Sequence, residues 1–185
     1  TGHTGPRDVG RIAYLAYLRN LAMRDLLEST ERFTHVIYLN DVFFCARGVV
    51  EMLWHTRAAA DASEPSGWGY AADMACSVDH TTDQLDLYDK WAAHDIQGRM
   101  FLNSKPYLVH PPSREAFARG RPFQVFSCWN GIVAVRADAI ADKGIRFRRN
   151  VPMECATSEC DLFCRDMWAL GFYRIIMLPR VKVTY

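Results

Sequence analysis

The sequence has 185 residues, of which half are hydrophobic and 23% are charged, so it can form one globular domain with a sizeable core. Its formal net charge of +1 gives no reason to expect a nucleic acid or a membrane surface as partner. No apolar run reaches the length of a transmembrane helix, and no signal peptide is visible. The six cysteines include no Cys-x-x-Cys pair, which argues against a zinc site. They are expected as buried thiols, or as one or two disulfides that involve Cys155, Cys160 and Cys164.

A helix and a strand open the predicted structure. Residues 9–29 carry apolar side chains at helical spacing and predict an amphipathic helix. Residues 35–39 form a continuous β-branched and aromatic run, which is typical of a parallel strand buried on both faces. Asn40 and Asp41 follow that run directly. Because ligands of open α/β sheets bind beyond the carboxyl ends of the strands, these two residues are candidates for a ligand site. A simple turn is the alternative.

The middle of the chain predicts a helix, a strand and a long loop. In chain order, we expect a helix over residues 47–60, a loop over residues 61–69, and a strand over residues 70–78 that ends in Asp79 and His80. Residues 88–99 mix polar and aromatic side chains without a clean period, which is typical of segments that carry function. Residues 103–122 hold four prolines and predict an ordered loop with one short helix.

The last third predicts further strands and helices. Residues 123–127 begin a third strand, which breaks at residues 128–131 and resumes over residues 132–135. Gly131 in this break could let a ligand approach the backbone, or could mark a bulge. The remaining expected elements are a helix over residues 137–143, a helix over residues 161–170 with Ser158 or Thr157 as N-cap and Gly171 as C-cap, and strands over residues 173–178 and 179–185. The pattern as a whole predicts an α/β domain with a mostly parallel sheet.

Several segments resemble those of nucleotide-sugar-dependent GT-A glycosyltransferases, and they occur in the same order. Arg19-Asn20 resembles the Arg-Asn pair in the helix before the donor strand, and Asn40-Asp41 resembles the carboxylate motif Asp-x-Asp. Residues 129–131, Trp-Asn-Gly, resemble the bend that borders the donor sugar. Residues 158–160, Ser-Glu-Cys, resemble the acidic motif at the start of the acceptor-side helix.

The resemblance is closer to one fungal family. Segments 39–42, 127–131, 158–160 and 179–185 look like those of the cryptococcal α-1,3-mannosyltransferases and capsule-associated proteins, glycosyltransferase family 69. Membership implies a GT-A fold and retaining α-1,3-mannosyl transfer from GDP-mannose to a mannose-containing glycan. It also implies a divalent cation, Mn²⁺ or Mg²⁺, and a type II membrane protein of the Golgi lumen. Val42 stands at the usual third position of the carboxylate motif, so a further metal ligand must come from elsewhere.

The chemistry of this reaction assigns roles to individual residues. The diphosphate leaving group must be neutralised, which a divalent cation with oxygen ligands achieves as a Lewis acid. Asp41 is the candidate metal ligand, and Glu159 is expected to act at the acceptor or the reacting carbon, so both are candidate catalytic residues. The candidate donor-binding residues are Arg19, Asn20, Asn40, Arg99, Trp129, Asn130 and Gly131. Further candidates for metal ligation are Asp79, Asp95, His94 and His110.

Alternatives stay open for these residues and for the function. Glu159 could serve only as a carboxylate favoured by a helix N-terminus, and Trp129 could belong to the core. The missing third carboxylate favours a second function, a non-catalytic nucleotide-sugar or glycan-binding module of the same fold. A third is a glycoside hydrolase with Asp41 and Glu159 as its carboxylate pair, in which the Arg-Asn and Trp-Asn-Gly segments have no particular purpose.

The predicted sheet is expected to extend beyond this sequence. A strand buried on both faces at residues 35–39 should have neighbours on both sides. The family resemblance implies several strands before the carboxylate motif, where this sequence offers one helix. We therefore expect residues 1–185 to be part of a single GT-A domain. Its N-terminal nucleotide-binding portion would lie in a preceding segment, either covalently joined or cleaved and still associated.

Overall fold

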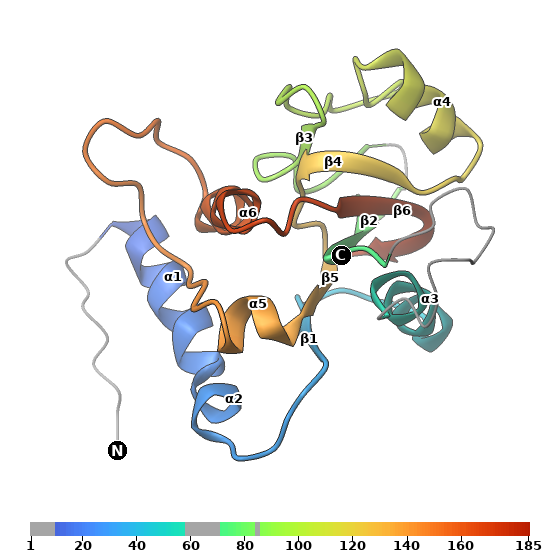
Figure 1. Cartoon of the computed structure of the whole chain (residues 1–185). Helices are drawn as coiled ribbons and strands as arrows, with labels where there is room; N and C mark the ends of the chain where they lie inside the picture. The colour runs from blue at the N-terminus through green and yellow to red at the C-terminus, as the bar shows by residue number, and fades with distance from the viewer. Residues whose placement is uncertain (1–9, 58–70, 84–85) are drawn as a thin grey trace.

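The structure is a computed structural model that describes residues 10–57, 71–83 and 86–185. Its helices are α1 (Arg11–Ala22), α2 (Arg24–Glu28), α3 (Ala46–Thr56), α4 (Pro111–Ala118), α5 (Ala137–Ala141) and α6 (Glu159–Ala169). Its strands are β1 (His35–Leu39), β2 (Met74–His80), β3 (His94–Asp95), β4 (Phe123–Ser127), β5 (Ile132–Arg136) and β6 (Ile175–Thr184). The six strands form one sheet in the order β1-β5-β2-β6-β4-β3 (Figure 1). The expected α/β class is confirmed.

The sheet is mostly antiparallel, so the expectation of a mostly parallel sheet is wrong. In the described ranges, only β2 and β6 pair in parallel, and β5 runs antiparallel to both β1 and β2. The expected broken strand over residues 123–135 is in fact two strands, β4 and β5, which β2 and β6 separate. Residues 128–131 connect these two strands across the sheet. Hydrophobic periodicity marks both strands but carries no information about this lateral displacement.

β1 lies at an edge of the sheet, contrary to the prediction that it is buried between two neighbours. It pairs only with β5 among the described strands, and the pairing is antiparallel. Its first four residues are half-buried, and Leu39 is 51% exposed. The apolar run therefore predicted the strand correctly. The predicted parallel pairing and the predicted burial on both faces are wrong.

Other elements differ from the prediction mainly at their ends. The expected helix over residues 9–29 is interrupted at Met23, which is buried and accepts a hydrogen bond from the Tyr38 hydroxyl. The expected helix after residue 47 ends at Thr56, and residues 58–70 lie outside the described part of the chain. β6 is one strand where two were expected. Its register against β2 shifts between Cys76 and Val78, close to the expected boundary.

Two hydrophobic cores lie on the two faces of the sheet. α3 contacts β5, β2 and β6, and Met52 of this helix packs with Val181 and Val183 of β6. On the other face, α6 contacts β4 and α1, and Phe163 of α6 packs with Trp129. No helix in the described ranges is long and apolar enough to cross a membrane.

A buried disulfide joins Cys76 of β2 to Cys128, which directly follows β4. Cys155, Cys160 and Cys164 are free, so the alternative of disulfides among these three is wrong. Cys160 and Cys164 are instead the expected buried thiols, because both point into the core from successive turns of α6. The Cys76–Cys128 pair arises from tertiary contact between distant segments, which cysteine spacing does not reveal.

Candidate functional site

The carboxyl ends of β1, β2 and β6 meet the start of β5 at one end of the sheet. The Asn40 N–H donates to the Gly131 carbonyl at 2.9 Å, which fixes the end of β1 beside the turn into β5. The Asn40 side-chain amide donates to the Tyr185 hydroxyl at 3.2 Å. The structure thus brings together two predicted donor-binding residues, Asn40 and Gly131, and adds Tyr185, which sequence reasoning had not selected.

The backbone conformation and a neighbouring side chain require a glycine at position 131. Its φ is +74°, a left-handed conformation that side chains disfavour. A Cβ atom here would lie 2.4 Å from Cγ2 of Val183. In this structure, the missing side chain at position 131 therefore allows β6 to lie close to the backbone.

Asn130 and Asp79 form the buried base of the site. Both residues are fully buried, and Nδ2 of Asn130 donates to Oδ1 of Asp79 at 2.8 Å. The same amide donates to the Asp89 carbonyl, while the Asp89 N–H donates to Oδ2 of Asp79. Burial raises the pKa of Asp79 to about 7, although the hydrogen bond from Asn130 opposes this rise. Oδ1 of Asn130 has no partner among the described residues.

The charges of three carboxylates act on Tyr185. Burial raises the pKa of Tyr185, the hydrogen bond from Asn40 opposes the rise, and the charges of Asp79, Asp89 and Asp41 add to it. The Tyr185 ring stacks on Tyr88, with centroids 3.9 Å apart. Asp41 itself is exposed beyond β1. The sequence therefore predicted two of these carboxylates as candidates, Asp41 and Asp79, and missed Asp89.

A second cluster joins α1 to the start of α6. Nε of Arg19 lies 3.1 Å from Oε1 of Glu159, and Glu159 is only 3% exposed. The Arg19 guanidinium carbon lies 5.0 Å from the centre of the Trp129 ring. Trp129 is buried against Tyr38 and Phe163, so it belongs to the hydrophobic core, as the alternative interpretation expected. Its ring is not open to a sugar in this structure.

Asp89 lies between the two clusters. Burial raises the pKa of its carboxyl group, the Trp91 backbone opposes the rise, the charge of Glu159 adds to it, and the charge of Arg19 lowers it. The predicted acceptor-side residue Glu159 is therefore in electrostatic contact with the carboxylates at the strand ends. Ser158, one of the two expected caps, accepts a hydrogen bond from the Asp161 N–H and begins α6.

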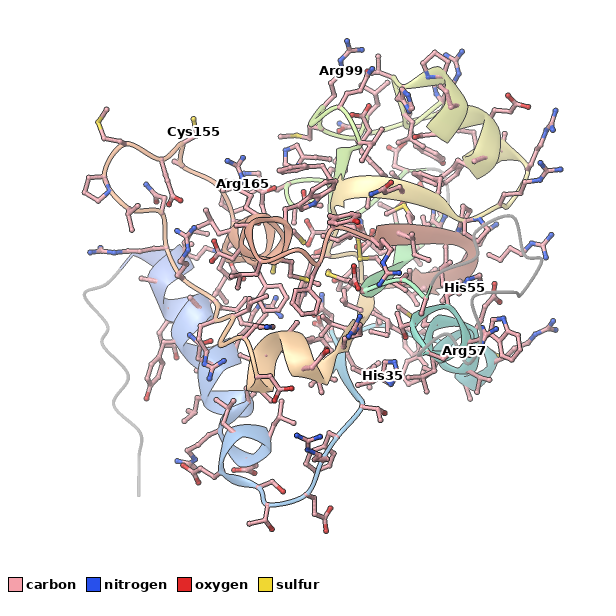
Figure 2. The ribbon with its side chains drawn as sticks, viewed as in Figure 1. His35, His55, Arg57, Arg99, Cys155 and Arg165 are labelled. Atoms are coloured by element: carbon pink, nitrogen blue, oxygen red, sulfur yellow. A yellow bond between two sulfur atoms is a disulfide. The ribbon has the colours of Figure 1, made fainter. Side chains whose placement is uncertain are left out.

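Other predicted residues have structural partners or lie apart. Asn20 exchanges two hydrogen bonds with the backbone of Phe147, which attaches α1 to the segment before α6. Arg99 is exposed and points away from the sheet in Figure 2. The Asp95 carboxylate accepts the N–H groups of Gln97 and Arg99 and shapes their turn. His110 hydrogen-bonds to a serine at the start of α4.

Comparison with known proteins places this chain in a known family. Residues 2–166 match the family described as Cryptococcal mannosyltransferase 1. The chain belongs to this family. It is also 30% identical, over 191 aligned residues, to alpha-1,3-mannosyltransferase CMT1 of Cryptococcus neoformans var. neoformans. That alignment covers 95% of this chain and 40% of the relative, so the chain spans less than half the length of the relative.

Membership of the cryptococcal mannosyltransferase family confirms the resemblance found in the sequence. The matched region includes the end of β1, the Trp-Asn-Gly bend and Glu159, and it stops before β6. Tyr185 and the carboxyl end of β6 therefore join the site through the fold and lie outside the matched region. The sheet pairing, with β6 parallel to β2, explains how they reach it.

The carboxylates of this family member offer hard oxygen donors but no complete metal cage. Among the residues that the structure describes, no three His, Cys, Asp or Glu side chains are grouped as a metal site. Asp41 is exposed, and its charge acts on Tyr185 together with the charges of Asp79 and Asp89. This arrangement fits a cation such as Mg²⁺, which is commonly held by one or two carboxylates together with substrate phosphates. It does not fit a cation held by protein side chains alone.

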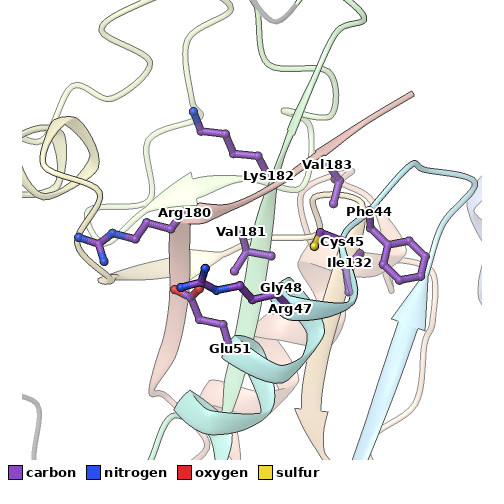
Figure 3. Close-up of a pocket in the computed structure, with 10 residues that line it drawn as sticks. All are labelled: Phe44, Cys45, Arg47, Gly48, Glu51, Ile132, Arg180, Val181, Lys182 and Val183. Atoms are coloured by element: carbon purple, nitrogen blue, oxygen red, sulfur yellow. The ribbon is translucent and has the colours of Figure 1, made fainter.

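A pocket of about 380 Å³ opens beside the strand ends, on the α3 face of the sheet (Figure 3). Its floor is apolar, and its rim carries three cationic side chains and one carboxylate. The residues that line it are Phe44, Cys45, Arg47, Gly48, Glu51, Ile132, Arg180, Val181, Lys182 and Val183. None of the site residues predicted from the sequence lines this pocket.

Proposed function

We propose that the protein is a retaining α-1,3-mannosyltransferase that uses GDP-mannose as donor and a mannose-containing glycan as acceptor. The observation that carries this proposal is the grouping of Asn40, Asp41 and Asn130 with Asp79 and Asp89 at the strand ends of a family member. Ligands of open α/β sheets bind at this position. The Cryptococcus neoformans relative is named as an α-1,3-mannosyltransferase, which supports the linkage.

The proposed division of roles follows from exposure and charge. Asp41 would hold Mn²⁺ or Mg²⁺ together with the diphosphate of the donor, because it is the exposed carboxylate at the end of β1. The cation would supply Lewis-acid neutralisation of the departing diphosphate. Asn40 and Asn130 would position the donor, and Glu159 would act on the acceptor side. Arg19 holds the carboxylate of Glu159 in place.

We also propose a lumenal location in the Golgi, with the protein attached to the membrane through a segment outside this sequence. The disulfide between Cys76 and Cys128 supports passage through an oxidising compartment, because disulfides are rare in cytosolic proteins.

Transfer is tested with the full-length protein and GDP-mannose, with α-1,3-mannobiose as acceptor. We expect GDP release that depends on the acceptor, is restored by Mn²⁺ after EDTA treatment, and gives an α-1,3 product by NMR. A product with inverted anomeric configuration would contradict retention. Absence of acceptor-dependent GDP release would contradict the enzyme itself.

One observation favours a second candidate function, a binding module without turnover. Val42 stands where the carboxylate motif usually has its third residue, as a family member that has lost catalysis could show. Such a module would bind GDP-mannose or the glycan in calorimetry and release no GDP. The same preparation therefore distinguishes the two functions.

A further inference from the structure

A buried polar group joins β3, β4 and α6 and has no part in the roles assigned so far. It consists of His94 on β3, Ser127 at the end of β4 and Asp161 in the first turn of α6. Nδ1 of His94 lies 2.9 Å from Oγ of Ser127 and 3.2 Å from Oδ1 of Asp161. Oγ of Ser127 donates to the same Asp161 oxygen at 2.8 Å. Ser127 and Asp161 are fully buried, and the His94 side chain is 14% exposed.

These distances fix which ring nitrogen of His94 carries a proton. An ionised carboxylate only accepts hydrogen bonds, so the proton between Ser127 and Asp161 belongs to the serine. Both oxygens that face Nδ1 are then acceptors, and Nδ1 must be the N–H nitrogen of the ring. In the neutral ring, Nε2 therefore carries the lone pair. A carboxylate that orients a histidine in this way makes the other ring nitrogen a well-placed base.

Asp161 is held in its ionised form. Burial acts to raise the pKa of its carboxyl group, but the hydrogen bonds from His94 and Ser127 and the charges of His94 and Arg165 outweigh burial, and the pKa is lowered to about 2. Nε of Arg165 lies 2.8 Å from Oδ2 of Asp161. Arg165 is labelled on α6 in Figure 2. The carboxylate is therefore a permanent acceptor that keeps the ring of His94 in one tautomer and one orientation.

Nε2 of His94 is available to a ligand. It makes no hydrogen bond within the described ranges and is not among their buried unpartnered atoms. The segment that carries His94 exposes apolar surface, with Trp91 44% exposed and Met100 50% exposed, and the backbone of His94 bridges to Met100. Sugars bind to surfaces that combine an aromatic ring with fixed polar groups.

The position of His94 relates this surface to the proposed reaction. Asp161 lies two residues after Glu159 in the first turn of α6, so His94 is attached to the same helix end as the acceptor-side carboxylate. Ser127 begins the segment that leads to Asn130 of the strand-end site. The His94 group is thus connected through α6 and through the segment after β4 to both clusters of the candidate site.

We propose that His94 is the proton acceptor for the acceptor sugar, and that the surface around Trp91 and Met100 forms the acceptor subsite. This inference rests on the proposed function. In the step, a hydroxyl oxygen of the acceptor sugar forms the bond to the anomeric carbon of the donor from the same face that the phosphate leaves, so the configuration is retained. The bond between that carbon and the phosphate oxygen breaks, and its electron pair leaves with the nucleoside diphosphate. The hydroxyl proton moves to Nε2 of His94, while Asp161 and Ser127 act as positioning residues.

The first test measures binding and needs no turnover. Full-length protein labelled with ¹⁵N-histidine is titrated with α-1,3-mannobiose and followed by long-range ¹H–¹⁵N NMR. We expect the His94 ring to show the Nδ1–H tautomer and its Nε2 resonance to shift with the saccharide. His110 is a matched control, because it also hydrogen-bonds to a serine but has no carboxylate partner in the described structure. The opposite tautomer, or an unchanged His94 resonance at saturating saccharide, would overturn the proposal.

The second test separates catalysis from folding. His94→Gln should lower kcat by about 100-fold, the lower end of the usual range for general acid–base catalysis, and leave the KM for GDP-mannose within about twofold. His55→Gln on α3 should leave both unchanged. Unchanged kcat in folded His94→Gln protein would overturn the proposal. If the wild type transfers no mannose, the proposed function fails, and the saccharide-dependent shift of His94 alone decides whether the subsite exists.

Discussion

Arg19 and Glu159 form an ion pair of 3.1 Å although 140 positions separate them in the sequence. The Glu159 side chain is 4% exposed and that of Arg19 is 23% exposed, so the pair lies largely out of solvent. It joins α1 to the first turn of α6, and the guanidinium also covers the Trp129 ring. The Arg-Asn pair and the acidic motif, which are remote in the sequence, are therefore parts of one unit.

This pair provides a test of the role of Glu159. Glu159→Gln should reduce the turnover of GDP-mannose far more than it weakens donor affinity, because it removes the negative charge on the acceptor side. Glu159→Ala should in addition lower the free energy of unfolding by about 3 kcal/mol, because it leaves the Arg19 charge without its partner. The measurements are steady-state kinetics and urea unfolding. If Glu159→Gln lowers stability and leaves the turnover of the folded protein unchanged, Glu159 is only a helix-terminal carboxylate.

Asp41 should be essential for activity and dispensable for folding. Asp41→Ala should abolish turnover and Mn²⁺-dependent GDP binding, because it removes the exposed carboxylate at the end of β1. The free energy of unfolding should change by less than about 0.5 kcal/mol, as expected for an exposed side chain. Asp25→Ala on α2 is the control, because this carboxylate is 93% exposed and remote from the strand ends. Tight GDP and Mn²⁺ binding by Asp41→Ala would exclude Asp41 as the metal ligand.

The Asp79 carboxyl group should make stability fall with rising pH. Its pKa in the folded protein is raised to about 7 by burial, against 3.8 as the ordinary value. Between these two pH values the folded state binds more protons than the unfolded state, so the free energy of unfolding decreases as pH rises. The contribution of Asp79 to the free energy of unfolding is fully present below pH 4 and is lost by about pH 7. It amounts to at most about 4 kcal/mol. Asp79→Asn should flatten the curve over this range, and an unchanged slope would contradict the raised pKa.

The disulfide should stabilise the domain by restricting the unfolded chain. Cys76 and Cys128 are 52 positions apart, a loop size for which the chain-entropy relation gives about 4 kcal/mol. Dithiothreitol should therefore lower the free energy of unfolding by several kcal/mol, and peptide mapping without reduction should recover the linked peptides. Cys155→Ser is the control, because Cys155 is an exposed free thiol and its replacement should leave both results unchanged.

Local features of the fold could be predicted from the sequence, because local patterns determine them. Helical spacing located α1 and α6, and Ser158 caps the start of α6 as expected, whereas the C-cap is Leu170 and Gly171 follows it with a positive φ. The β-branched run located β1, and the motif residues led to the strand-end site. These features depend on neighbours within a few positions, which is the range over which propensity and capping act.

Features that depend on contacts between distant segments could not be predicted. Nothing in residues 123–135 indicates that β4 and β5 are separated by two other strands. Asp89 was not selected because its role depends on a hydrogen bond to Asp79, and the Asp161 contact to His94 likewise appears only in the folded chain. The sequence gives a weak indication that Asp89 and His94 are functional, since both lie in residues 88–99, where polar and aromatic side chains mix without regular spacing.

The open edge of β1 leads to the last prediction. Residues His35–Leu39 are apolar enough for a central strand, yet they have a partner on one side only within the described structure. Such an edge exposes unpaired backbone groups and promotes association with another chain. We propose that a preceding segment of the full-length protein adds strands along β1 and supplies most of the guanine and ribose pocket.

If so, residues 1–185 expressed alone should aggregate or fail to bind GDP, whereas the full-length protein should be soluble and bind it. Leu39→Lys places a charge at the end of the open edge and should reduce aggregation of the isolated chain, because edge lysines oppose strand pairing. Val50→Lys on α3, where the residue is 66% exposed, adds the same charge away from the edge and should have no such effect. Light scattering and calorimetry with GDP measure both properties. A soluble monomer of residues 1–185 that unfolds cooperatively and binds GDP would show that β1 needs no further strand.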